Sequence, residues 1–214
     1  MQVSPYVITI SRELGSGGAA VGKRIAERLG IFYLDREILA EAARHFKLSE
    51  GELAELEERA TPFWKTFLMA GTYTTPEMFL EPPLYLPSDR ELFEVESKIM
   101  ARVARERPAV IIGRGGSYML KGHPRHLGVF IHAGVAFRSQ RVQELFRLAE
   151  KDARDLIEKT DKERARYIQS VTGRDWKDLR QYHLAVDSGV MGLAAAEDLI
   201  LAAVKARFGA VAPA

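Results

Sequence analysis

The sequence of 214 residues contains no cysteine, which excludes disulfide bonds, thiolate zinc sites and cysteine nucleophiles. It also lacks a strong excess of one charge: the formal net charge is +2, which gives no bulk signal for binding nucleic acid or a membrane. No apolar run approaches the length of a membrane span, because Glu197 and Asp198 interrupt even the alanine-rich C-terminal stretch. The first residues, MQVSPY, lack the basic and apolar regions of a signal peptide, so we expect a cytoplasmic protein.

The stretch from residue 7 to residue 30 organises the chain. Val7 to Ile10 form a short β-branched run that is typical of a strand buried on both faces. A glycine-rich turn follows at Gly15, Ser16, Gly17 and Gly18, and an amphipathic helix then runs to Gly30 with Val21, Ile25 and Leu29 on one stripe. Strand, glycine-rich turn and helix together direct backbone N–H groups and a helix N-terminus at a phosphate. We therefore predict a nucleotide-phosphate loop here.

The lysine of this loop is a problem, because the apparent Walker A match through Gly22 and Lys23 fails at Arg24, where Ser or Thr is required. If the helix begins near Gly18, Lys23 lies in its second turn, rotated by about 200° from Val21. We therefore interpret Lys23 as a surface helix residue rather than a phosphate ligand. In this register Gly18 stands in place of the phosphate lysine and Ala20 in place of the magnesium hydroxyl, so Gly15 to Ala20, including Ala19, would bind phosphate through the backbone.

Charged residues follow the other apolar runs, at the strand ends where open α/β sheets bind ligands. Asp35 and Arg36 follow the run 31–34, although Asp35 can equally be a helix cap, and Asp187 follows the run 184–186. Gly113 and Arg114 follow the central run 109–112 and precede two further glycines. We select Arg114 as the first candidate functional residue, because a purely structural arginine seldom needs three neighbouring glycines.

The rest of the chain is predicted to be mostly helical, with one exception. Residues 61–90 combine five prolines with six aromatic residues, which favours a flap packed on the core or on a second subunit over a lid or a base-binding wall. A helix at 135–150 would bury Leu145 and Ala149 and place Arg138 and Arg141 three residues apart. These two arginines call for a phosphate or for salt bridges. A charge-dense helical pair at 151–180 is either a solvated face or a closing lid, and one helix is expected at 189–208.

Several segments occur in the order and spacing of a known family: ITISRELGSGG (8–18), FYLDREIL (32–39), VIIGRGGSYML (110–120), TDKERARYIQSVTGRDW (160–176) and LAVDSG (184–189). In these segments the chain resembles the bacterial cytidylate kinase-like proteins, a branch of the P-loop nucleoside monophosphate kinases. The resemblance implies one α/β domain over residues 1–214, a three-layer sandwich with a parallel sheet of about five strands. It also implies an ATP site at the glycine loop, a monophosphate-binding region at 35–90 and a lid at 150–175.

The resemblance also implies roles for individual residues. Arg114 matches an arginine that holds the acceptor phosphate, but the aspartate that follows it in the family's motif is Gly115 here. Arg164, and with it Arg166, matches the lid arginines.

The first functional hypothesis is an ATP-dependent phosphotransferase acting on a small acceptor, a nucleoside monophosphate such as CMP or dCMP. Arg114, Arg138 and Arg141 would hold the phosphates and Arg164 would close from the lid. Arg12 would supply the charge that Gly18 lacks, unless it pairs with a nearby carboxylate. Mg²⁺ would be held mainly by phosphates and water, and the acceptor would meet Asp35, Arg36, Gly113, Arg114 and Asp187.

Two other hypotheses stay open. One is a degenerate P-loop module that binds a nucleotide and acts through protein interaction, which the missing lysine and hydroxyl favour. The other is a structural homodimer formed through the aromatic segment at 61–90.

Overall fold

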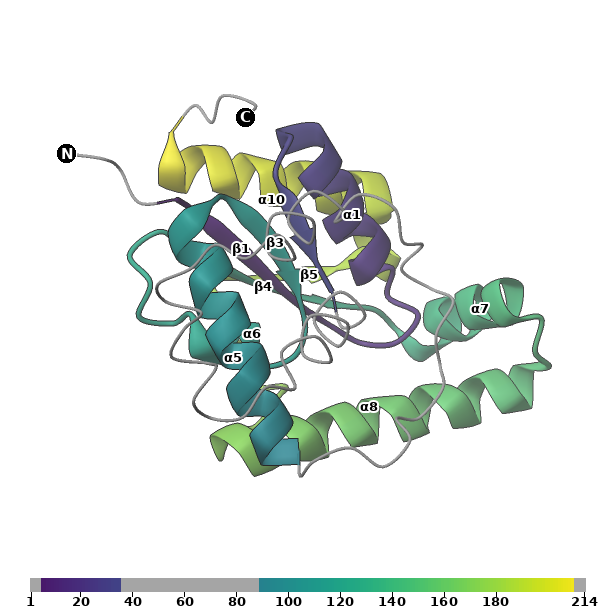
Figure 1. Cartoon of the computed structure of the whole chain (residues 1–214). Coiled ribbons are helices and arrows are strands. Elements are labelled where there is room, and N and C mark those ends of the chain that lie inside the picture. Colours follow the sequence, from purple (N-terminus) through teal and green to yellow (C-terminus); the bar gives the residue numbers. More distant parts are fainter. Residues whose placement is uncertain (1–4, 36–88, 210–214) are drawn as a thin grey trace.

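The computed structural model describes residues 5–35 and 89–209. In this part of the chain, five parallel strands form one sheet in the order β2-β3-β1-β4-β5 (Figure 1). The strands are β1 (Val7–Arg12), β2 (Phe32–Leu34), β3 (Ala109–Ile112), β4 (His126–His132) and β5 (Leu184–Asp187). The predicted α/β fold with a five-stranded parallel sheet is therefore confirmed.

Helices cover both faces of the sheet and make three layers (Figure 1). Ile8 and Ile10 of β1 point to the face covered by α1 (Gly18–Leu29) and α10 (Leu193–Phe208). Val7 of the same strand points to the opposite face, where α5 (Asp89–Glu106) and the short α6 (Gly116–Met119) pack. Side chains alternate along a strand, so the β-branched run buries both of its faces, as a central parallel strand requires.

A two-helix hairpin, α7 (Val135–Phe146) and α8 (Glu150–Thr172), extends from the sheet (Figure 1). Val142 of α7 packs with Ala153 and Ile157 of α8 in a small core of their own. Leu14, which follows β1, packs against this core. The hairpin is thereby attached to the segment predicted to bind phosphate.

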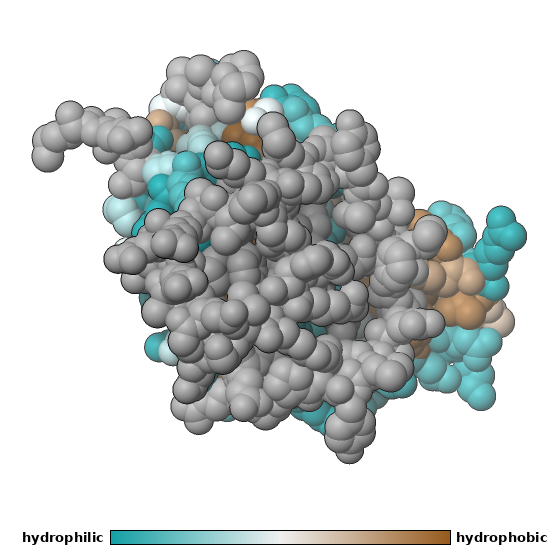
Figure 2. Space-filling view, viewed as in Figure 1, coloured by the Kyte–Doolittle hydropathy of each residue, from teal (hydrophilic) through white to brown (hydrophobic). Residues whose placement is uncertain are grey.

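The predicted helix at 135–150 is wrong at its C-terminal end. The chain leaves the helix at Arg147, whose φ of 54° is left-handed, and Leu148 packs into the core of the hairpin. Ala149, which the prediction placed inside, is exposed for this reason, and Leu145 is exposed although it lies within the helix. Apolar colour gathers over the region of α7 in Figure 2, and Val135 and Leu145 are the exposed large apolar residues of that helix.

Two further helix predictions are corrected. The expected helical pair at 151–180 is one helix, α8, which ends at the left-handed Gly173 and is followed only by the 3₁₀ turn η1 (Leu179–Gln181). The expected helix at 189–208 is two, because Gly192 (φ 77°, ψ 157°) separates α9 (Ser188–Met191) from α10.

Some predictions fall on residues that the structure does not describe. These are Arg36, nearly all of the monophosphate-binding region expected at 35–90, and within it nearly all of the aromatic segment at 61–90, together with its proposed role as a dimer interface. Among the helices that are described, none combines the length and the apolar character needed to cross a membrane.

Candidate functional site

The candidate site lies at the carboxyl edge of the sheet, because all five strands are parallel and end on the same side. Two glycine-containing turns leave this edge from neighbouring strands. We call residues 13–18, after β1, the glycine loop, and residues 113–115, after β3, the arginine turn. β1 and β3 pair in register from Val7 with Ala109 to Ile10 with Ile112, so the two turns begin side by side.

The glycine loop needs its glycines for close contacts and for left-handed backbone. Gly15 (φ 81°) and Gly17 (φ 76°) adopt conformations that favour glycine. A Cβ atom at Gly15 would lie 2.7 Å from the carbonyl oxygen of Arg138, and one at Gly17 would lie 2.5 Å from a methyl group of Leu193. The loop is therefore enclosed by α7 on one side and by the start of α10 on the other.

The loop leads directly into α1, as the apolar stripe predicted. Helix α1 begins at Gly18, and Gly17 caps it without a side chain. The amides of the first turn of a helix have no intrahelical acceptor, so the N–H groups of Gly18, Ala19 and Ala20 are suited to an anion. Lys23 lies in the second turn and is half-buried. Ala20 carries only a methyl group at the position expected to hold a magnesium hydroxyl.

Hydrogen bonds hold the loop in this shape. The buried hydroxyl of Ser16 donates to the carbonyl oxygen of Glu13 at 2.9 Å. The buried hydroxyl of Ser188, at the end of β5, donates to the carbonyl oxygen of Ser16 at 2.7 Å and lies 3.0 Å from that of His132. Ser16 therefore acts on the loop backbone, and Ser188, the first residue of α9, anchors the loop from outside it.

Arg12 occupies the space that a lysine at position 18 would need. A Cβ atom built on Gly18 would lie 2.6 Å from the Cβ and 3.1 Å from the Cγ of Arg12. At the other end of the side chain, a Cβ atom on Gly113 would meet the Nη1 of Arg12. Arg12 thus runs from the glycine loop to the arginine turn, and Gly18 leaves room for its Cβ and Cγ atoms.

The arginine turn holds three successive left-handed residues, with φ values of 72° at Gly113, 50° at Arg114 and 71° at Gly115. For a non-glycine residue this conformation costs about 1 kcal/mol. The Nε of Arg114 donates to Oε2 of Glu96 at 2.7 Å. Its guanidinium carbon lies 4.1 Å from the centre of the Tyr167 ring. Arg114 is therefore oriented by α5 and α8 as well as by its own turn.

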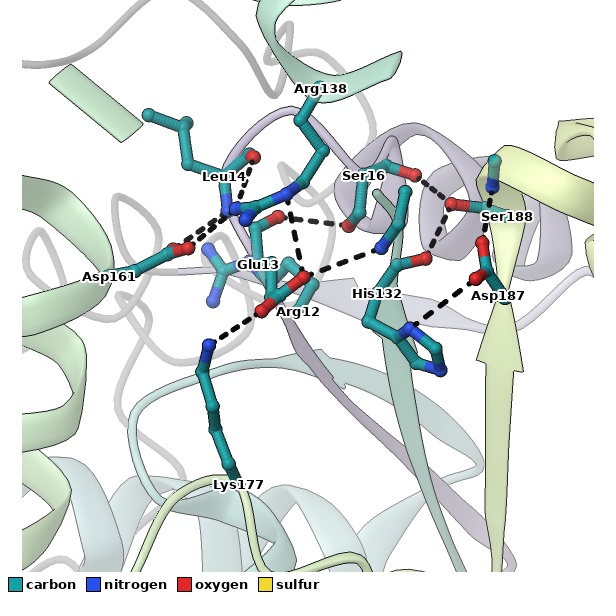
Figure 3. A network of polar contacts seen from close by, with 12 residues as sticks. Arg12, Glu13, Leu14, Ser16, His132, Arg138, Asp161, Lys177, Asp187 and Ser188 are labelled. Atoms are coloured by element: carbon teal, nitrogen blue, oxygen red, sulfur yellow. Dashed lines mark hydrogen bonds and ion pairs between the residues drawn. The ribbon is translucent and has the colours of Figure 1, made fainter. Parts of the chain in front are cut away.

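Arg138 lies at the centre of a buried ion-pair network (Figure 3). Its Nη1 donates to Oδ2 of Asp161 at 2.6 Å and lies 3.3 Å from the carbonyl oxygen of Leu14. Its Nε lies 3.5 Å from Oε2 of Glu13. The salt bridges that the sequence left open as an alternative to phosphate are thus present at Arg138. Breaking such a buried pair by removing one partner costs about 3–5 kcal/mol.

The same network brings α8 and the segment after it onto the glycine loop. Oδ1 of Asp161 accepts a hydrogen bond from the amide of Leu14 at 2.9 Å, and the Nη1 of Arg164 donates to the carbonyl oxygen of Arg12 at 3.1 Å. Lys177 donates to Oε1 of the buried Glu13 at 2.8 Å, as Figure 3 shows. The segment predicted as a lid therefore lies directly against the loop.

The remaining predicted site residues lie less centrally. Arg141 has its guanidinium 6.0 Å from the Phe137 ring. Asp35 is buried at the end of β2. Asp187 caps α9, because its carboxylate accepts from the amides of Gly189 and Val190, and it lies 3.8 Å from the Nδ1 of His132. Arg166, on α8, is exposed.

A buried polar network joins β1 to α6 and β4. Oγ1 of Thr9 on β1 lies 2.8 Å from Oγ of Ser117 on α6, two residues after the arginine turn. The same Oγ1 lies 2.8 Å from Nε2 of His126 on β4. Burial, together with the nearby His183, His123 and Arg207, lowers the pKa of His126 from 6.5 to about 3. His126 is therefore neutral in the folded protein at neutral pH.

Sequence reasoning missed the residues that reach the site from a distance. Glu96, Tyr167, Asp161 and Lys177 were part of helical or charge-rich patterns that carried no local signal of a site. For Glu96, a signal was the position of an acidic residue beside the apolar stripe of its helix. Across residues 5–35 and 89–209, no group of three His, Cys, Asp or Glu side chains could hold a metal ion.

The fold and the site define a P-loop kinase architecture, with a parallel sheet, a glycine loop after β1 and helices on both faces. Residues 7–190 match the sequence profile of the cytidylate kinase-like family, and the chain belongs to that family. The match supports a P-loop phosphotransferase as the general class of activity.

Solved structures agree on the fold. An uncharacterized protein from Eubacterium ventriosum is 24% identical with a TM-score of 0.71, and the alignment covers 94% of this chain and 99% of that one. A gluconokinase from Sinorhizobium meliloti is 17% identical with a TM-score of 0.53, over 96% and 94% of the two chains. TT1252 from Thermus thermophilus has the same identity and TM-score, over 96% and 99%. No curated protein matches the sequence significantly.

Proposed function

We propose that this protein transfers the γ-phosphoryl group of ATP to a small phosphorylated acceptor, a nucleoside monophosphate such as CMP or dCMP. The observation that carries the proposal is the path of Arg12. Its side chain passes Gly18 of the glycine loop and ends against Gly113 of the arginine turn. One cation thereby joins the donor side and the acceptor side of the site, which is where a phosphoryl group in transfer has to be stabilised.

In this proposal the donor phosphates bind to the loop backbone and to Arg12. The N–H groups of Gly15 to Ala20 hold the phosphate oxygens, and Arg12 supplies the positive charge that a lysine would supply at position 18. Phosphoryl transfer needs alignment and charge neutralisation more than covalent chemistry. A loop without a lysine is therefore compatible with transfer when a cation reaches the same place from β1.

The acceptor phosphate binds at Arg114. A guanidinium recognises a phosphate through paired N–H groups, and Arg114 still has a buried Nη2 without a hydrogen-bond partner among the described residues. Arg138 supports the loop through Glu13 and Asp161, and Arg164 and Arg141 flank the site. The arrangement brings two phosphates to one edge of the sheet.

The side chains of the site could contact Mg²⁺ only through water, and none of the described ones is placed to bind the ion directly. Ala20 offers no hydroxyl ligand, and the described residues contain no ligand cluster. Bound Mg²⁺ would neutralise phosphate charge and would be held by nucleotide oxygens and water, with Asp35 as a partner through water. Neutralisation by this chain itself falls to Arg12 and Arg114.

A second candidate function is a nucleotide-binding module without transfer, which acts through protein interaction. The observation that favours it is the internal pairing of Arg138 with Asp161 and Glu13, which engages one of the expected phosphate ligands.

Consumption of ATP in the presence of CMP, dCMP or UMP separates the two functions. We expect ATP consumption that requires one of these monophosphates, together with stabilisation by ATP and a further stabilisation by that acceptor. A ligand at a hundred times its dissociation constant stabilises the fold by about 2.7 kcal/mol. Stabilisation by ATP without consumption would favour the binding module, and no stabilisation by any nucleotide would refute both functions.

A further inference from the structure

The guanidinium of Arg114 is held on two sides by Glu96 and Tyr167, to which sequence reasoning assigned no individual role. Glu96 of α5 is 1% exposed, and its Oε2 accepts from the Nε of Arg114 at 2.7 Å. The ring of Tyr167 on α8 lies 4.1 Å from the guanidinium carbon and covers one face of the group. The hydroxyl of Tyr167 donates to the same Glu96 oxygen at 3.3 Å. Three elements of the chain therefore meet at one side chain.

The packing around this group is close and specific. Phe93 of α5 contacts the Tyr167 ring edge to face, with centroids 6.3 Å apart and planes at 76°. A Cβ atom on Gly115 would lie 2.8 Å from the Phe93 ring. The glycine that follows Arg114 thus makes room for the aromatic pair. The position that the family's motif fills with a carboxylate has none here, and the carboxylate beside Arg114 comes from Glu96.

This arrangement leaves one side of Arg114 for a ligand. The Nε is used by Glu96 and the guanidinium carbon lies over the Tyr167 ring, so two contacts fix the position of the group. Nη2 is buried and has no partner among the described residues. A planar guanidinium that is already oriented loses less freedom when it binds two oxygens of an anion.

We infer that Glu96 and Tyr167 are positioning residues for Arg114, and that Tyr167 makes phosphate binding at the arginine turn depend on the docking of α8. The inference rests on the proposed function, because it assigns the acceptor phosphate to Arg114. Helix α8 would orient Arg114 on the acceptor side through Tyr167, and α8 also contacts the glycine loop through Asp161 and Arg164. Loss of the ring should therefore weaken binding of the acceptor and leave ATP binding unchanged.

The test uses the full-length protein labelled with ¹⁵N at arginine. Inorganic phosphate is titrated while the Nε–Hε signal of Arg114, assigned with an Arg114→Lys variant, is followed by NMR. We expect phosphate to move this signal and Tyr167→Leu to weaken phosphate binding at least tenfold. The same variant should remove the ring-current shift of the signal. Tyr167→Phe, which keeps the ring, should stay within threefold of the wild type.

Controls separate positioning from folding. Tyr182→Phe also removes one tyrosine hydrogen bond, the 2.9 Å bond to the carbonyl oxygen of Trp176, and should leave phosphate binding unchanged. In steady-state assays Tyr167→Leu should raise the KM for CMP about tenfold, with the KM for ATP and kcat within threefold. Glu96→Gln should also raise the KM for CMP. A lower KM in this variant would show that Glu96 competes with phosphate, and would overturn its positioning role.

Failure of the inference can be told apart from failure of the proposed function. If phosphate does not move the Arg114 signal, or if Tyr167→Leu binds phosphate as the wild type does, the inference is wrong even in an active enzyme. If phosphate behaves as expected but no monophosphate supports ATP consumption, the kinase proposal is wrong. The positioning of Arg114 for an anion would then still stand.

Discussion

The glycine loop and the arginine turn are both built on left-handed glycines at the ends of paired parallel strands, yet in the proposed function they supply different parts of a phosphate site. The loop retains its backbone shape, with Gly15 and Gly17 in left-handed conformations, but carries no lysine at position 18. The turn retains its arginine in a left-handed conformation and surrounds it with Glu96 and Tyr167. Backbone recognition and side-chain recognition are thus divided between two neighbouring turns.

The side chain of Arg12 connects the glycine loop and the arginine turn. It lies at the end of β1, packs on Gly18 and reaches Gly113. If the proposed function holds, the difference between the turns shows how a cation from a neighbouring strand end can replace a missing motif lysine. The three predictions that follow test this division, in order of decreasing expected effect.

The largest effect is expected from a matched pair of arginine variants. Arg114→Ala should lower kcat/KM for the acceptor about a thousandfold and leave the Kd of ATP within twofold, because it removes a phosphate ligand on the acceptor side only. Arg12→Ala should weaken ATP binding as well as transfer. Calorimetric titration of ATP and steady-state kinetics measure both.

Lys23→Ala is the control for this pair, since Lys23 lies in the second turn of α1. Its ATP affinity should equal that of the wild type. If Lys23→Ala weakened ATP binding more than Arg12→Ala, the position assigned to the missing lysine would be wrong.

The second prediction concerns the network of Thr9, Ser117 and His126, which joins β1 to α6 and β4. The folded protein keeps His126 neutral, with a pKa of about 3, whereas the unfolded chain takes up a proton near pH 6.5. Stability from this group is therefore complete above pH 6.5 and is lost as the pH falls towards 3. Between pH 7 and pH 4 the loss should be about 3 kcal/mol.

Urea unfolding of the wild type and of His126→Gln at several pH values tests this expectation. The two proteins share every other titrating group, so the difference between their pH profiles isolates His126. Parallel profiles would refute the role of the buried histidine.

The smallest effect is expected from exchanging the residues at positions 12 and 18. Gly18→Lys should destabilise the fold by about 1–3 kcal/mol, because the new Cβ would lie 2.6 Å from that of Arg12. In an Arg12→Gly background the same substitution should be milder by about 1 kcal/mol, as a double-mutant cycle would measure. Strict additivity would show that the two side chains do not share space.

Much of the fold followed from local patterns in the sequence. The β-branched runs predicted the central strands, and the stripe of Val21, Ile25 and Leu29 placed the start of α1 at Gly18, where the structure has it. The end of α7 was not predictable in this way. No glycine or proline marks Arg147, and the chain turns there because Leu148 finds a place in the core of the hairpin.

The candidate site was predictable only as a set of positions. The rule that ligands bind at strand ends pointed to Gly113 and Arg114, and the missing lysine at position 18 pointed to Arg12. Their mutual arrangement depends on contacts across the sheet, such as that of Arg12 with Gly113, and on helices far along the chain. Glu96 and Tyr167 lie 18 and 53 residues from Arg114 in sequence, and no periodic pattern relates them.

The shared space of Arg12 and Gly18 also bears on how such a loop can change over generations. A lysine gained first at position 18 meets Arg12, whereas a glycine gained first at position 12 removes the cation before another is present. Each single step is therefore unfavourable, although the double exchange restores a Gly-x₄-Gly-Lys pattern across residues 12–18. Proteins that carry Arg12 therefore do not easily regain a lysine at position 18 through single substitutions, although other positions of the glycine loop can still change.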